Sequence, residues 1–293
     1  MARLDRRGEH TLVDEADSAD IVLMLDAHQH LADWSMQATR THPYIRAYPE
    51  KVFVYDERDT PRDSLPGVYV AMPRRHFDAR RHRAISYYRL KNDTRGVHND
   101  DPDLLFSFQG RHVTGVRSEV LALEHPRAVI EDTSGLDFFT ADPAGLVRAQ
   151  ADYREVLGRS KFVLCPRGAG TASFRLFEAL ACGRVPVIVS DDWVEPKGVD
   201  WSSCSVRVPE RHAAILPRRL EELEQEWPQM SQAARAAYDD WFAPEVWFHR
   251  VIEDCRDLGM EGKLGVKRQW STRAYWRSAA NHWKHGLVSH RRT

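Results

Sequence analysis

The chain has 293 residues, of which 42% are apolar and 29% are charged, and its formal net charge is −1. This composition is typical of a folded soluble protein, and the balanced charge excludes a surface built as a whole to bind nucleic acid. The length allows one large domain or two small ones. The four cysteines form no C-x-x-C pair, so we expect buried reduced thiols, with neither a zinc site nor a disulfide.

The N-terminal segment is polar, and we expect residues 1–18 to be flexible. It is charged and lacks an apolar centre, so it does not read as a signal peptide. No stretch of the chain approaches the roughly 20 consecutive apolar residues that a membrane span needs. These features predict a cytoplasmic protein.

Short apolar runs in the first half predict buried parallel strands, because strands covered on both faces lose their polar alternation. Proline and charged residues stop most of them. The basic stretch at residues 74–98 predicts irregular structure. We expect strands at 19–26, 51–55, 67–72, 104–108 and 127–131, and helices at 31–41 and 118–123.

Strands and helices also alternate in the second half. Gly183 follows a helical stretch and is typical of a helix end. We expect strands at 161–164, 185–190 and 205–208, helices at 144–157 and 171–181, and mainly helix up to 257. The alternation predicts an α/β fold with parallel sheets covered by helices on both faces. We place a domain boundary near residue 140, which separates a domain at 19–140 from a domain at 141–258.

The last segment, residues 259–293, is rich in Lys, Arg and Trp and has a single acid, Glu261. Such a tail could contact an anionic membrane face and hold the protein at the membrane periphery. The favoured alternative is a C-terminal helix whose Trp side chains pack on the body of the protein.

The stretch at residues 160–192 carries the strongest chemical signal. A buried strand leads to a Gly-x-Gly turn at Gly168 and Gly170, and a helix is expected to begin at once. Glycines there can adopt backbone angles barred to other residues and let a ligand approach the main chain. The free amides and dipole of the helix start favour phosphate, and Thr171 and Ser173 add hydroxyl groups.

Charged side chains extend this phosphate site. Arg167 and Arg175 supply guanidinium groups that match phosphate oxygens in two-point geometry. Glu178 lies three residues after Arg175, on the same helix face, where its carboxylate could accept from ribose hydroxyls. The pattern lacks the Lys of a Walker A loop and the third Gly of a dinucleotide fingerprint. The physical features alone leave a second interpretation open, a tight turn followed by a surface Arg–Glu pair.

As a whole, this stretch closely resembles the donor-binding motif of the exostosin-like glycosyltransferases, glycosyltransferase family 47. A weaker likeness reaches back along the chain to His42-Pro43-Tyr44 and to the strand that ends in Gly110-Arg111. The positions that match the donor motif are Ser160, Lys161, Phe162, Leu164, Pro166, Gly168, Ser173, Arg175, Glu178, Ala179, Gly183, Pro186, Val187 and Ile188.

The resemblance implies a GT-B architecture: two Rossmann-like αβα domains with a cleft between them, and the donor held mainly by the C-terminal one. It also implies an inverting enzyme of polysaccharide biosynthesis that uses a nucleotide-diphosphate sugar, such as a UDP-sugar, a glycan acceptor and no metal or other cofactor. Helix amides and arginines would then stabilise the leaving nucleotide. The candidate arginines are Arg111, Arg167 and Arg175.

An inverting transfer needs a base that takes the acceptor proton. Three residues at ends of the first strands are candidates, Asp26, His28 and Asp56, and each has a plain alternative as a loop cap or a structural side chain. Asp191 and Asp192 follow a later strand and either contact the donor sugar or cap a turn.

Two alternative functions remain open. The first is a degenerate relative that binds a nucleotide sugar without transferring it. The second is a metal-dependent transferase of the GT-A type, in which Asp101 and Asp103 would hold the metal. These two residues precede a strand rather than follow one, which favours an ordinary loop.

Overall fold

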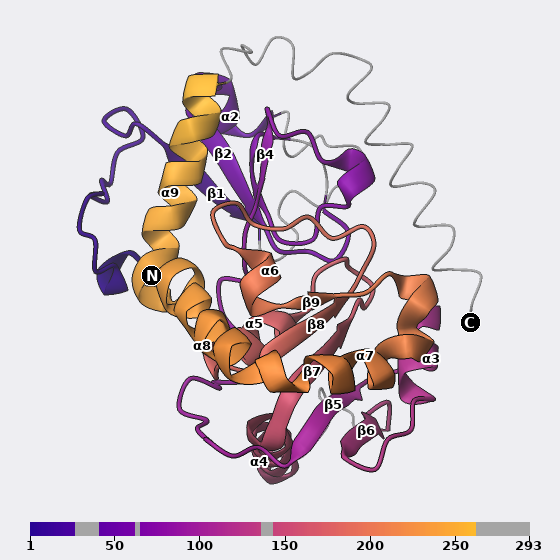
Figure 1. The fold of residues 1–293 in the computed structure, drawn as a ribbon. Helices are drawn as coiled ribbons and strands as arrows, with labels where there is room; N and C mark the ends of the chain where they lie inside the picture. Colours follow the sequence, from indigo (N-terminus) through magenta and orange to yellow (C-terminus); the bar gives the residue numbers. More distant parts are fainter. Residues whose placement is uncertain (27–40, 62–64, 136–142, 262–293) are drawn as a thin grey trace.

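The computed structural model describes residues 1–26, 41–61, 65–135 and 143–261. They form two parallel sheets (Figure 1). The first has the order β1-β2-β3-β4, with all pairs parallel. Its strands are β1 (Val22–Asp26), β2 (Val52–Asp56), β3 (Gly67–Tyr69) and β4 (His82–Ala84).

The second sheet has the order β6-β5-β7-β8-β9 and is also parallel throughout. Two parallel sheets with helical crossovers confirm the α/β class and the Rossmann-like organisation of both halves. The strands are β5 (Leu104–Gly110), β6 (Ala128–Asp132), β7 (Ser160–Pro166), β8 (Val185–Val189) and β9 (Val206–Arg207).

Strands β5 and β6 belong to the second sheet, whereas the sequence grouped them with the first half of the chain. Phe106 of β5 pairs with Ala128 of β6 on one side and with Phe162 of β7 on the other. The change of sheet therefore falls between β4 and β5, well before the expected boundary near residue 140. No sequence feature shows which strands β5 pairs with, because a fully buried strand has the same apolar pattern in either sheet.

Strand β4 lies in the basic stretch expected to be irregular. Its His82 and Arg83 are 0% and 2% exposed, and the side chain of Arg83 donates to the carbonyl of Ala79. The rings of Tyr69 and Phe77 pack edge-on against His82. A strand whose buried side chains are polar has no apolar pattern, and this explains why the sequence missed it.

Helices cover both sheets. The expected helices at 118–123, 144–157 and 171–181 are present as α3, α4 and α5, while the one at 31–41 lies almost wholly outside the described residues. The helices of the described residues, these three included, are given next in chain order. They are η1 (Ala2–Leu4), α2 (Pro43–Ala47), η2 (Arg74–His76), α3 (Gly115–Leu121), α4 (Pro143–Arg159), α5 (Phe174–Ala181), α6 (Trp201–Cys204), η3 (Glu210–Ile215), α7 (Leu216–Leu223), η4 (Glu224–Glu226), α8 (Trp227–Ala237), η5 (Tyr238–Phe242) and α9 (Pro244–Glu261).

The C-terminal helix of the described chain returns to the first sheet. Helix α9 runs beside β1–β4 (Figure 1), where the Trp247 ring packs edge-on against Tyr55 at 5.0 Å and Tyr88 at 5.3 Å. The N-terminal residues lie along the same helix, since the amide of Arg6 donates to the carbonyl of Glu245. The flexibility expected for residues 1–18 stays a prediction, although Arg6 makes this contact with α9.

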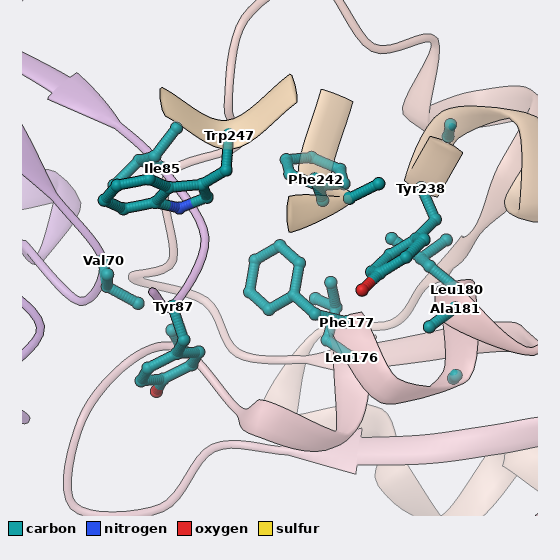
Figure 2. Close-up of a cluster of buried hydrophobic side chains, with 14 of the residues drawn as sticks. Val70, Ile85, Tyr87, Leu176, Phe177, Leu180, Ala181, Tyr238, Phe242 and Trp247 are labelled. Carbon is teal, nitrogen blue, oxygen red and sulfur yellow. The ribbon is translucent and has the colours of Figure 1, made fainter. Parts of the chain in front are cut away.

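One apolar core joins the two sheets. Figure 2 shows Val70, Ile85 and Tyr87 from the first half facing Phe177 of α5, with Phe242 and Trp247 above them. Tyr87 also stacks on Phe174 at 3.6 Å, and Phe177 packs edge-on against Phe242 at 5.1 Å. Contacts of this kind add to the area that the rings bury, so the two halves share their stabilisation.

All four cysteines are buried and unpaired, as expected. Within the described residues, no helix combines the length and the apolar character needed to cross a membrane. The basic tail falls outside the described residues, so its membrane contact stays a prediction.

Candidate functional site

The Gly-x-Gly loop follows β7, the central strand of the second sheet, and joins it to α5. The carboxyl ends of β5, β7 and β8 lie at the same edge, because all three strands are parallel. Ligands of such sheets bind outside this edge. The loop also touches the first half of the chain, since the hydroxyl of Thr171 donates to the carbonyl of Ala71 at 3.0 Å.

The glycines of this loop serve close packing rather than an unusual backbone. Neither Gly168 nor Gly170 has a positive φ. The expectation that these two glycines adopt backbone angles barred to other residues is therefore wrong. A Cβ on Gly170 would lie 2.6 Å from an oxygen of Asp59 and 3.2 Å from the Cβ of Ala71. A Cβ on Gly168 would lie 3.1 Å from the guanidinium of Arg117. The glycines therefore let this loop approach groups from other elements.

Helix α5 begins at Phe174, three residues later than expected, with Ser173 as its N-cap. Ser173 makes no side-chain capping bond, so its hydroxyl is not committed to the helix start. Thr171 differs, because its hydroxyl donates to the carbonyl of Ala71, so a phosphate would have to compete for it. The end of the helix is as expected: Gly183 has a φ of +66° and its amide donates to Leu180.

Two guanidinium groups lie against one aromatic ring at the end of β5. Arg175 stacks over Phe108 at 4.7 Å and donates to the carbonyl of Gln109. Arg117 of α3 lies 5.8 Å from the same ring and donates to the carbonyls of Arg111 and Arg167. In the described part of the chain, neither arginine forms a salt bridge with a carboxylate, and the Nε of Arg175 is buried without a hydrogen-bond acceptor.

The positive charges of Arg117 and Arg175 repel each other. Burial, followed by the charge of Arg175, lowers the pKa of Arg117 to about 10, and the nearby Asp59 acts in the opposite direction. Two cations held together in a partly dry place gain free energy when an anion binds between them. Sequence reasoning missed Arg117, although its place one turn into the helix after β5 puts it at the binding edge of the sheet.

The other two candidate arginines differ from this pair. Arg167 forms an ion pair with Glu210, in which its Nε donates to both carboxylate oxygens, at 2.8 and 3.0 Å. A phosphate would have to compete with that carboxylate. Arg111 is exposed next to Arg117, so it could reach a ligand from the solvent side.

Glu178 is 2% exposed, and both of its carboxylate oxygens accept hydrogen bonds from other residues of the chain. One oxygen accepts from the backbone amide and side chain of Asn92, at 2.9 and 3.0 Å, and the other accepts from the Tyr153 hydroxyl at 2.7 Å. A ribose would have to displace one of these donors. The geometry therefore gives Glu178 a bridging role between α4, α5 and the 92–94 segment, and it argues against the alternative of a surface Arg–Glu pair. Its binding of ribose stays a prediction.

The candidate bases fare differently. Asp56 is 1% exposed and accepts from the amide and guanidinium of Arg58. Asp26 ends β1 next to Asp56 in register, its side chain is not described, and His28 lies outside the described residues. Asp59, in the loop after β2, is exposed and has an oxygen close to Gly170. Asp59 faces the donor loop from the first half of the chain, which is the side on which the sequence analysis expects the base. Sequence reasoning missed this residue.

The remaining acidic candidates have structural partners. Asp103 is bound by Arg159 at the amino end of β5, the edge opposite the Gly-x-Gly loop. Asp192 pairs with Arg75, and its carbonyl accepts from the amide of Arg74. The basic stretch at 74–75 thus links the first half to the turn after β8.

The chain matches known proteins across this site. The Exostosin GT47 domain matches residues 76–223, which is half of the chain and includes both arginines and the donor loop. The chain belongs to the exostosin GT47 family.

Relatives in this family are much longer than the matched part. The Exostosin-1 homolog of Caenorhabditis elegans is 39% identical over 98 residues, which cover 30% of this chain and 24% of that protein. Exostosin-1 of Drosophila melanogaster is 40% identical over 68 residues, 22% of this chain and 9% of that protein. The matches thus span a quarter or less of these relatives. The crystal structure of TarM covers 71% of this chain and 50% of its own, with 10% identity and a TM-score of 0.40.

Proposed function

We propose that this exostosin GT47 member is an inverting, metal-independent glycosyltransferase that uses a nucleotide-diphosphate sugar, with UDP as the favoured nucleotide. The observation that carries the proposal is the pair of guanidinium groups on Phe108, Arg117 and Arg175, beside the donor loop. A diphosphate between them would relieve their repulsion and satisfy the free Nε of Arg175. A glycan hydroxyl would enter from the Asp59 side.

In this proposal the arginines take the place of a metal ion. As the bond between sugar and diphosphate breaks, negative charge builds on the leaving nucleotide. Guanidinium groups that are already in place and partly desolvated stabilise that charge without reorganising. Arg111 would add a third donor from solvent. Supporting metal independence, Asp103 lies at the opposite edge of the sheet and is held by Arg159.

The test is donor hydrolysis and transfer with a panel of nucleotide sugars, with and without EDTA. We expect Arg175→Ala and Arg117→Ala to lower kcat about 10²-fold each, the usual cost of removing one transition-state donor. The matched control is Arg218→Ala, whose side chain is 87% exposed on α7. Unchanged turnover in both site variants, or activity restored only by Mn²⁺, would contradict the proposal.

The degenerate binding protein is the competing function. The buried, ion-paired state of Asp56 favours it, because this candidate for the base cannot take a proton from an acceptor in this state. Calorimetry with UDP, together with the turnover assay, separates the two functions. If UDP binds, Arg175→Ala weakens that binding and no donor is turned over, the protein binds a nucleotide sugar at this site but is not an enzyme.

A further inference from the structure

A second cluster of chemically active side chains lies away from the donor loop. His249 and Glu253 are four residues apart, on one face of α9, and His10 reaches them from the N-terminal segment. Each residue offers one metal-ligand atom, and these atoms all lie within 4.8 Å of one another. The N-terminus meets α9 near its first turn (Figure 1).

The ligand-type atoms of the cluster make no hydrogen bonds, although the Nε2 of His10 and one Glu253 oxygen lie within ion-pair distance of each other. These are the Nε2 of His10, the Nδ1 of His249 and one carboxylate oxygen of Glu253. His249 is only 7% exposed, so water is a poor substitute for a missing partner. Buried polar atoms without partners are rare because each costs free energy. Three of them in one place indicate a shared ligand.

We propose that His10, His249 and Glu253 bind one zinc ion, with a water molecule as the fourth ligand. Two imidazoles and a carboxylate form a recurrent zinc ligand set. Zinc bonds of about 2.0–2.2 Å place tetrahedral ligands roughly 3.4 Å apart. The Nε2 of His10 and the Glu253 oxygen are already 3.3 Å apart. The other ligand atoms lie within 4.8 Å of one another, so small side-chain rotations would bring them to this spacing.

The surroundings support this geometry. The second oxygen of Glu253 accepts from Arg256, which fixes the carboxylate and leaves its first oxygen for the metal. The imidazoles of His10 and His249 stack at 5.1 Å, with 25° between their planes. Arg250 is the cation next in sequence, but its guanidinium lies over Trp241 at 3.7 Å and donates to the carbonyl of Asp240.

The zinc would fasten the N-terminal segment to the helix that joins the two halves. Residue 10 and residue 249 are far apart in sequence, so one ion closes a very long loop of chain. This is a structural role, separate from the diphosphate site. The sequence predicts no zinc site, because it has no C-x-x-C pair and no histidine spaced as a zinc partner.

Calorimetry with Zn²⁺ on the metal-stripped full chain, without a histidine tag, tests the site. We expect one zinc per chain, with affinity lowered at least 100-fold in His249→Ala and in His10→Ala. The matched control is His98→Ala, whose imidazole is 83% exposed beside Asp100. Absence of binding, or equal loss in the control, would overturn the proposal.

Three further measurements keep the result clear. If an alanine variant does not fold, Co²⁺ bound to the wild type should show the intense visible absorption of a four-coordinate ion, and a weak six-coordinate spectrum would count against the site. Zinc should also slow trypsin cleavage after Arg6 and Arg7 in the wild type but not in His10→Ala. Activity lost in EDTA and restored by Zn²⁺ alone would indicate this site, whereas restoration by Mn²⁺ alone would concern the donor site.

Discussion

The uncharged ring of Phe108 contacts the guanidinium groups of two arginines. Its ring holds Arg117 from α3 and Arg175 from α5. A carboxylate in the same position would neutralise the pair and leave nothing for a diphosphate to bind. At the scale of single residues, the site therefore depends as much on an aromatic platform as on the guanidinium groups.

In the proposed enzyme, two carboxylates are candidates for the base that takes the acceptor proton. We expect Asp59→Asn to lower kcat by 10²–10⁴-fold, the usual contribution of a general base, with little change in stability because the side chain is exposed. Asp56→Asn should instead mainly reduce stability, because it removes a buried partner of Arg58. Initial rates and urea unfolding of both variants separate these roles. Full activity in Asp59→Asn would rule it out as the base.

Among the elements, those with strong apolar patterns were predictable. The buried strands β2, β7 and β8 and the end of α5 at Gly183 follow from continuous apolar runs and one glycine. The polar strand β4 could not be predicted, because it has no apolar pattern. The pairing of β5 with β7 could not be predicted either, because it depends on contacts between distant parts of the chain.

The candidate site shows the same division. The donor loop and Arg175 were identified from a motif, because the sequence itself carries the Gly-x-Gly turn and the helix that follows. Arg117 and Asp59 were missed, since each reaches the loop from another element and neither belongs to a local pattern. Only the fold brings them beside Gly168 and Gly170.

The turn between α7 and α8 is tied to the second sheet by one carboxylate. Glu224 in η4 accepts from Arg127 at 2.6 and 2.7 Å and from Lys161 of β7 at 2.6 Å. The hydrogen bonds from Arg127, then from Lys161, lower the pKa of Glu224 to about 2.

This carboxylate predicts a pH dependence. A lowered pKa in the folded state contributes stability above the unfolded pKa of 4.5, and that contribution is lost as the pH falls toward 2. We expect Glu224→Gln to cost about 1–2 kcal/mol at pH 7, after allowing for solvent screening of a partly exposed group. The difference from wild type should shrink below pH 4.5. Urea unfolding at several pH values measures it, and a difference that is constant with pH would contradict the assignment.

For the whole molecule, the shared core joins the two sheets. Trp247 is 2% exposed and comes from the helix that returns to the first sheet. We expect Trp247→Ala to lower the free energy of unfolding by about 3–5 kcal/mol. The control is Val147→Ala on α4, where Val147 is 62% exposed and the change should stay within about 0.5 kcal/mol. Fluorescence and far-UV circular dichroism should report the same transition, and separate transitions would show that the halves unfold independently.

The aromatic stack of Tyr87, Phe174 and Phe177 also limits how the protein can move. Rotating one half against the other would slide these rings apart and wet them, at a cost of several kcal/mol. We therefore expect the two halves to travel together during a catalytic cycle. Substrates would then enter and leave through short excursions of residues 57–61, which include the exposed Asp59 and Thr60. Hydrogen exchange should be faster there than in the packed donor loop at 167–173.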